Sequence, residues 1–150
     1  MNWSVWELKI TQECDYAIRI VLMLSELGAG ARVDANSIAQ AQGVPQRFTV
    51  KILRKLVQGG VVCSFKGAKG GYCLQRPPED ITLKELVFLI DGPVEINKCL
   101  GDGYVCGRGR MQTCAVRRQL QRINNMICDE LGKLDFASLR QQETAGQKNS

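Results

Sequence analysis

The sequence predicts a mainly α-helical fold with a small β-hairpin and a long C-terminal dimerisation helix. Three observations predict it. Apolar residues recur at helical spacing through most of the first 60 residues, a glycine-rich turn then joins two short apolar runs, and a long helical repeat begins near Gln112. A chain of 150 residues can form one such domain with an appended helix.

Three helices are expected before residue 60. The first follows Thr11, a residue suited to cap a helix N-terminus, and the second spans about 35–42. Gly43 ends the second, and Pro45 starts a third that runs to about residue 58, because proline is tolerated in a first turn. Two helices joined by a short glycine turn predict a helix-turn-helix, whose second helix enters the major groove of DNA.

A β-hairpin is expected directly after these helices. The runs 61–65 and 72–74 are typical of strands, and the segment 66–71 joins them in a glycine-rich turn with two lysines. This turn lacks the strand-to-helix context of a phosphate-binding loop. A basic hairpin, or wing, beside a basic helix suits phosphate contacts on either side of a groove. Residues 1–80 are therefore predicted to form a winged helix-turn-helix DNA-binding domain.

The distribution of charge is consistent with a polyanionic partner. The net charge of +5 is mild, but the segment 35–78 contains no Asp or Glu and several Lys and Arg residues. From charge alone, a solvated basic face explains this equally well, whereas the predicted elements favour a double-stranded DNA operator. The predicted contacts are Gln46 and Arg47 for base edges, Thr49 and Lys51 for the phosphate backbone, Arg54 on the same helix, and Lys66 and Lys69 for phosphates at the wing.

The region after residue 80 is expected to pair two subunits. A further helix opens at Thr82 with a capping box and stops at Gly92. The last helix, from about 112 to 134, carries apolar residues at alternating three- and four-residue steps, which favours a homodimer seam over packing on its own domain. We predict a cysteine loop and dimerisation helix over 81–137 and a flexible tail over 138–150. The seam residues are Val116, Leu120, Ile123, Ile127, Leu131 and Leu134.

Seven cysteines have to be explained in a chain that is expected to be cytoplasmic. The sequence contains no apolar run long enough to span a membrane, and its N-terminus lacks the pattern of a secretion signal. A reducing compartment disfavours a disulfide framework. Cys63 and Cys73, on the two predicted strands, and Cys128, beside the helix seam, need no function as small apolar residues.

Three other cysteines lie in the loop before the last helix. Cys99, Cys106 and Cys114 fall within 16 residues that also include four glycines and little apolar material. Burial cannot order a loop of this composition, which favours a bound metal. The closely paired cysteines that zinc prefers do not occur there, and the wide spacing suits a larger iron–sulfur cluster.

Four motifs occur in the same order as in a known family and cover roughly residues 10–135. They are Tyr16-Ala17-x-Arg19, the helix end Ile52-Leu53-Arg54-Lys55-Leu56, the wing Lys69-Gly70-Gly71-Tyr72, and Asp91-Gly92 followed by three spaced cysteines. This combination resembles the IscR/NsrR family of bacterial winged-helix regulators, several of which hold an iron–sulfur cluster that is easily lost in air. The resemblance implies a dimer through the last helix and a [2Fe-2S] or [4Fe-4S] cluster ligated by Cys99, Cys106 and Cys114.

The fourth ligand is where the chain departs from part of that family. IscR-like members place a histidine three residues after the third cysteine, but here that residue is Arg117 and the chain has no histidine. NsrR-like members use an aspartate of the first helix, and the resemblance assigns this role to Asp15, reaching the cluster of the other subunit, with Glu13 or Cys14 as substitutes. Alternatively, Asp15 is an ordinary acid in a first helical turn. An oxygen ligand binds iron less firmly than a thiolate, so that iron is expected to react with nitric oxide or oxygen.

Three functions remain open. The leading one is a transcription regulator, a repressor, whose operator binding depends on a cluster that senses redox state, nitric oxide or cluster status. In the second, a cluster-free winged-helix regulator uses the loop cysteines as a thiol switch or protein-partner site, as CymR-like relatives regulate through a protein. The third, an electron carrier or enzyme, is disfavoured because the chain offers no histidine and no nucleophile–base pair.

Overall fold

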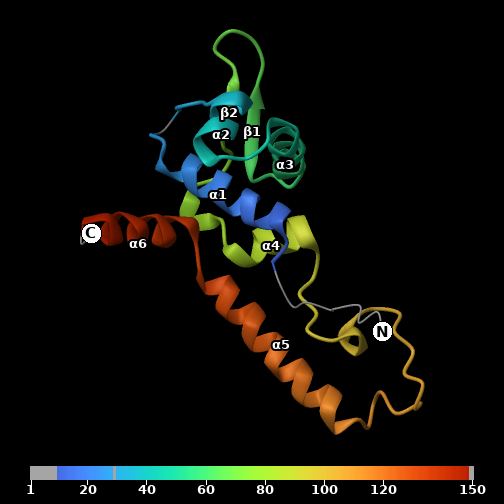
Figure 1. The fold of residues 1–150 in the computed structure, drawn as a ribbon. Coiled ribbons are helices and arrows are strands. Elements are labelled where there is room, and N and C mark those ends of the chain that lie inside the picture. The colour runs from blue at the N-terminus through green and yellow to red at the C-terminus, as the bar shows by residue number, and fades with distance from the viewer. Residues whose placement is uncertain (1–9, 29, 149–150) are drawn as a thin grey trace.

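The computed structural model describes residues 10–28 and 30–148 and confirms the predicted fold class. Helices α1 to α3 and the hairpin β1–β2 form one lobe, α5 extends away from it, and α6 turns off in another direction from the end of α5 (Figure 1). One short 3-10 turn precedes α4 and another follows it. The elements are α1 (Gln12–Glu26), α2 (Ala35–Gln42), α3 (Gln46–Gln58), β1 (Val62–Phe65), β2 (Gly71–Leu74), η1 (Pro78–Asp80), α4 (Leu83–Asp91), η2 (Lys98–Leu100), α5 (Ala115–Lys133) and α6 (Phe136–Lys148).

Local capping sets where these helices begin. The hydroxyl of Thr11 accepts the N–H of Cys14 at the start of α1, and Asp34 does the same for Ser37 in α2. Between α2 and α3, Gly43 has a φ of 62°, a left-handed conformation that glycine adopts without strain. The helix-turn-helix therefore forms where the sequence predicts it.

The wing is a two-stranded antiparallel sheet in which Cys63 pairs with Cys73. Near the turn end of β2, Tyr72 exchanges two backbone hydrogen bonds with Val33, which lies in the connection between α1 and α2. This close approach requires Gly71, because a Cβ there would lie 2.9 Å from the Val33 carbonyl oxygen. Arg32 adds a second attachment, with its guanidinium 3.4 Å from the centre of the Phe65 ring.

One buried cluster joins the lobe to the C-terminal region. Ile20 of α1, Ile52 and Leu56 of α3, Leu86 of α4 and Phe136 of α6 are all fully buried in it. The core thus contains residues from both sides of residue 80, the predicted boundary between two domains. Within the described ranges, no helix is long and apolar enough to cross a membrane.

The C-terminal segment differs from the flexible tail predicted over 138–150. Its described part is helical to Lys148, and its first turns pack on the lobe. The Asp135 carboxylate accepts the N–H of Ser138 at 2.8 Å, and Arg140 donates to the Ser25 carbonyl of α1. The polar composition after Leu139 pointed to a tail, whereas the cap and the buried Phe136 hold the segment as a helix.

Candidate nucleic-acid interface and cysteine loop

Helix α3 separates its residues into a buried stripe and an exposed basic face. Gln46, Arg47, Lys51 and Arg54, all predicted contacts, lie on the exposed face. The Arg47 guanidinium stacks 4.9 Å from the centre of the neighbouring Phe48 ring. The face also exposes Val50, which the sequence reasoning missed. A partly exposed apolar side chain among these polar groups is suited to contact a thymine methyl group.

Thr49 does not belong to this face, and its predicted contact with the DNA backbone is wrong for this conformation. Its side chain is completely buried, and its hydroxyl donates to the Pro45 carbonyl at 3.4 Å. The reason is helical periodicity, because Thr49 lies three, four and seven residues before Ile52, Leu53 and Leu56, which form the buried stripe.

Lys66 and Lys69 are exposed in the turn of the wing, as a phosphate contact requires. The position of this turn is fixed by Arg32, whose guanidinium donates to the Lys69 carbonyl at 3.3 Å as well as stacking on Phe65. Arg32 is itself exposed and adds a positive charge beside the wing. Its role depends on a contact across 37 residues of sequence, so no local pattern could have revealed it.

The first turn of α1 is bonded to α3. Glu13 pairs with Lys51 at 3.0 Å and with Lys55 at 2.6 Å. The hydrogen bond from Lys55 lowers the pKa of Glu13 below its usual value, and Lys51 acts in the same direction against partial burial. Glu13 therefore stays ionised and neutralises part of the charge that α3 offers to DNA.

The same turn contains the other predicted ligands of the cluster. Asp15 is half-exposed and pairs with Arg19 at 2.7 Å. Cys14, a predicted substitute, is completely buried, and this burial, together with the nearby Asp91 carboxylate, raises its pKa to about 12. A thiol in that setting is a poor metal ligand, since ligation needs the thiolate. Asp15 is thus the accessible donor of this turn.

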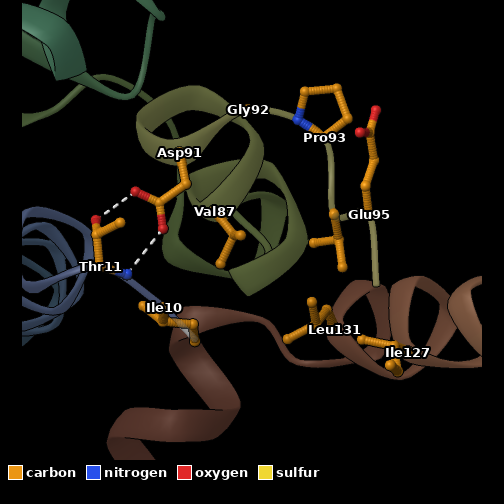
Figure 2. A pocket seen from close by; sticks show the side chains of 10 residues that line it. Ile10, Thr11, Val87, Asp91, Gly92, Pro93, Glu95, Ile127 and Leu131 are labelled. Atoms are coloured by element: carbon orange, nitrogen blue, oxygen red, sulfur yellow. Dashed lines mark hydrogen bonds between the residues drawn. The ribbon is translucent and has the colours of Figure 1, made fainter. Parts of the chain in front are cut away.

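Asp91, the last residue of α4, fastens α4 to the start of α1. Its carboxylate accepts the N–H of Thr11 at 3.0 Å and also the Thr11 hydroxyl. Below this contact lies a pocket of about 370 Å³ between α1, α4 and α5. In Figure 2, Val87 of α4 and Leu131 of α5 point into it from opposite sides. The end of α4, where the cysteine segment begins, is therefore connected directly to the turn that carries Glu13 and Asp15.

Helix α5 holds the cysteine segment through two polar side chains. The amide of Asn124, which is 7% exposed, donates to the Val94 carbonyl and accepts the N–H of Ile96. The guanidinium of Arg117 donates to the Cys99 carbonyl at 2.9 Å. Arg117 stands where IscR-like sequences have histidine, and in this chain it positions the loop backbone.

Two of the three loop sulfurs accept backbone N–H groups. The Cys114 sulfur caps α5 by accepting the N–H of Arg117 at 3.4 Å. Hydrogen bonds from the backbone of Arg108 and Arg110 lower the pKa of Cys106. Such bonds stabilise thiolate, the form that binds iron, and they also tune iron–sulfur clusters. The lowered pKa of Cys106 thus fits the predicted cluster.

The predicted ligands, all of them described residues, are not assembled into one metal-binding group in this structure. In the described part of the chain, no three Cys, Asp or Glu side chains form a group that could hold a metal ion. Cys99, Cys106 and Cys114 are each partly buried in the same loop. The described arrangement of the loop therefore does not by itself form the predicted ligand set.

The predicted seam of α5 is divided between two faces. Ile127 and Leu131 line the pocket against α4, which is contact with their own domain. Val116 and Ile123 are 66% and 45% exposed, and Met126, which the prediction did not include, is 58% exposed. The seam therefore combines packing within the chain with an apolar surface that faces solvent.

A helix-turn-helix followed by a basic wing defines a winged-helix DNA-binding protein, the class to which this fold and its exposed residues point. The chain belongs to the Rrf2 family, whose model, described as an iron-dependent transcriptional regulator, matches residues 10–142. The family and its relatives are transcription regulators and not enzymes.

Individual relatives agree with this assignment. An rrf2-like HTH-type transcriptional regulator of Rhodobacter capsulatus is 41% identical over 97 residues, which are 61% of this chain and 63% of that protein. The chain thus matches less than two thirds of that relative's length. CymR, the global cysteine regulator of B. subtilis, has the same fold with a TM-score of 0.75 and 23% identity, over 91% of this chain and 98% of CymR. T. potens IscR also has this fold, with a TM-score of 0.72 and 20% sequence identity over 93% of this chain and 90% of that protein.

Proposed function

We propose that this protein is a repressor that binds an operator as a homodimer, and that an iron–sulfur cluster at the cysteine loop controls its binding. One observation carries the proposal. The first turn of α1 is bonded on one side to the DNA-facing helix, through Glu13, and on the other to the end of α4, through Thr11 and Asp91. A change at the cysteine segment thus has a short path of polar contacts to α3.

The DNA-binding part of the proposal assigns roles by exposure. Gln46, Arg47 and Val50 contact base edges, because they lie at the N-terminal end of α3, the part of a recognition helix that enters the groove. Lys51 and Arg54 lie further along the same face and contact phosphates. Lys66 and Lys69 contact phosphates from the wing, in place of the role that Thr49 cannot fill.

The cluster part assigns ligands by donor chemistry. Cys99, Cys106 and Cys114 hold the cluster, and Asp15 of the other subunit supplies the fourth donor. The bound cluster supplies iron that reacts with nitric oxide, oxygen or other oxidants, most readily at the position with the weaker oxygen donor. Backbone N–H groups lower the pKa of Cys106 toward the form that binds iron, and Arg117 holds the backbone at Cys99.

Control of DNA binding follows from the contacts of the same residues. When Asp15 and the cysteines are held together, the first turn of α1 is fixed relative to α5. When they separate, this turn is free to shift, and Glu13 shifts with it. Because Glu13 pairs with Lys51 and Lys55, a shift changes how much positive charge α3 presents to phosphates.

A second copy of the chain is the proposed occupant of the exposed face of α5. Ile123 lies seven residues after Val116 and Met126 three residues after Ile123, so the three share one side of this helix. Apolar side chains that recur with this spacing are typical of helix–helix seams. A homodimer also matches the two-fold symmetry of a palindromic operator.

The test begins with protein purified without air. Iron and sulfide analysis and a visible absorption spectrum should show a cluster, which Cys106→Ser removes and Cys128→Ser retains. DNA fragments selected from a random library by the cluster-loaded protein should then be retarded by it and bound differently after the cluster is removed. A colourless protein without iron and sulfide would rule out the cluster.

The cluster-free alternative is supported by a specific observation, the lowered pKa of Cys106 in a loop whose cysteines form no metal group among the described residues. A thiol with a lowered pKa reacts readily with electrophiles and oxidants. In this case the anaerobic protein is colourless, yet alkylation at Cys106 alters operator binding. The same preparation therefore distinguishes the two candidates.

A further inference from the structure

Two cysteine thiols outside the cysteine loop face each other in the wing. Cys63 of β1 and Cys73 of β2 are directly paired in the sheet, and their sulfur atoms lie 2.9 Å apart. Both side chains are partly exposed. Cys73 also lines a pocket of about 380 Å³ beside the end of α1, together with Leu27 and Arg76. A small solute can therefore reach the pair.

The register shows what a bond between these sulfurs requires. Gln75 donates its N–H to the Val61 carbonyl at 2.9 Å, so residues 61 and 75 form a hydrogen-bonded pair. Such pairs alternate along an antiparallel sheet, which makes Cys63 and Cys73 a hydrogen-bonded pair with Cα atoms about 5.5 Å apart. This separation lies within the range of about 4.4–6.8 Å that disulfides span.

We propose that Cys63 and Cys73 are a redox-active dithiol that a hydroperoxide converts to a reversible disulfide within the wing. The thiolate of one cysteine attacks the peroxide oxygen, giving a sulfenic acid and, after protonation, water. The second thiolate attacks that sulfur, the S–S bond forms, and hydroxide leaves and is protonated to a second water. The two sulfurs lose two electrons, which reduce one hydrogen peroxide to two waters.

The surroundings set the rate and the reversibility. Burial, followed by the adjoining Cys63 thiol, raises the pKa of Cys73 to about 11. Because only the thiolate reacts, oxidation should accelerate as the pH rises. A disulfide on a partly exposed two-stranded hairpin is accessible to exchange, and intracellular thiols reduce accessible disulfides more readily than buried ones.

The consequence for DNA binding rests on the proposed function. Closing the sulfur–sulfur distance from 2.9 Å to the bonded length of about 2.05 Å draws β1 toward β2 and changes their twist. Lys66 and Lys69 lie in the turn that these two strands carry. Oxidation should therefore displace the wing lysines and weaken DNA binding.

The first experiment detects the bond without DNA. Full-length protein is treated with hydrogen peroxide at pH 8, its remaining thiols are alkylated, and it is digested with trypsin. The expected product is peptide 56–66 joined to peptide 70–84, about 2 Da lighter than the two reduced peptides together, and lost on reduction with dithiothreitol. Cys63→Ser and Cys73→Ser should abolish it, whereas Cys128→Ser, which changes a partly buried thiol of α5, should retain it.

Two outcomes would overturn the proposal. One is recovery of both peptides alkylated and unlinked after the oxidant has been consumed, and the other is a link from either cysteine to a different thiol.

The second experiment compares DNA retardation by reduced and oxidised protein, both with the loop changed by Cys106→Ser so that the cluster does not contribute. Oxidation should weaken binding about tenfold and dithiothreitol should restore it; a cross-link with unchanged affinity would refute the regulatory role. Failure of the reduced, cluster-loaded wild-type protein to bind any selected DNA would instead refute the proposed function and leave the peptide result intact.

Discussion

Replacement of Glu13 by Gln tests whether the first turn of α1 restrains the recognition helix. The change keeps the size of the side chain and removes its charge, so Lys51 and Lys55 lose their common partner. Both lysines then become available to phosphates. The variant should bind DNA more tightly, most clearly at low salt.

The magnitude follows from exposure and charge. The side chains of Lys51 and Lys55 are 55% and 34% exposed and that of Glu13 is 24% exposed, so each pair contributes at most about 1 kcal/mol to folding. We expect the free energy of unfolding to fall by about 1 kcal/mol. Each additional phosphate contact makes the slope of log affinity against log salt steeper by about 0.9. In the wild type, pairing with Glu13 competes with the phosphate contact of Lys51, so its release should steepen the slope by up to about one contact.

The assay is a salt titration of DNA affinity. Glu26→Gln is the matched control, because it makes the same change at an exposed position at the other end of α1. If Glu13→Gln and Glu26→Gln have the same affinity and the same salt slope, Glu13 does not restrain α3 and the proposed path of control is wrong.

The pH dependence of stability gives a second check on Glu13. Its pKa is lowered in the folded protein, so its contribution is present above the unfolded value of 4.5 and is lost as the pH falls through the folded value. The difference in unfolding free energy between wild type and Glu13→Gln should therefore be constant near neutral pH and should disappear as the pH falls below 4.5. A difference that persists unchanged in acid would show that it does not come from the carboxylate.

Four further substitutions test other parts of the structure. Arg47→Ala should cost about 1–3 kcal/mol of operator binding and relax the preference at one base position, measured by selection on mutated sites. Lys69→Ala should weaken binding to all DNA sequences alike and make the slope of log affinity against log salt shallower by about one phosphate contact. An unchanged slope would exclude the wing from the interface. Phe136→Ala should reduce the free energy of unfolding by about 3–5 kcal/mol in a denaturant titration, because this side chain is completely buried, whereas a tail residue would cost almost nothing. Asn124→Ala should cost about 1–3 kcal/mol, since it removes two hydrogen bonds to the part-buried backbone on both sides of Glu95, and amide exchange at Ile96 should accelerate.

Much of the DNA-binding lobe could be predicted because its determinants are local. Thr11, Gly43 and Pro45 mark helix boundaries within a few residues of their own positions, and the wing follows from two short strands around a glycine turn. The burial of Thr49 was also predictable in principle, since it shares the period of Ile52 and Leu56. Its polar side chain suggested an exposed position instead.

The remaining features depend on contacts between distant segments. Glu13 meets Lys51 across 38 residues, and Arg117 meets the carbonyl of Cys99 across 18. No periodicity or composition encodes such pairs, because they depend on how whole helices pack. For α6, the buried Phe136 and the cap at Asp135 were present in the sequence, but their stabilising effect depends on the surface of α1 that the helix meets.

The double hydrogen bond between Tyr72 and Val33 has a practical consequence for protein engineering. The wing therefore consists of β1, β2 and the segment at residues 32 and 33. Val33 pairs with β2, and Arg32 donates a hydrogen bond to the Lys69 carbonyl in the turn. A chimera that transplants only residues 62–74 into another winged-helix protein would lose the support that sets the direction of the wing. A transplant that also carries residues 32 and 33 keeps that support and, with it, the angle at which the lysines approach a duplex.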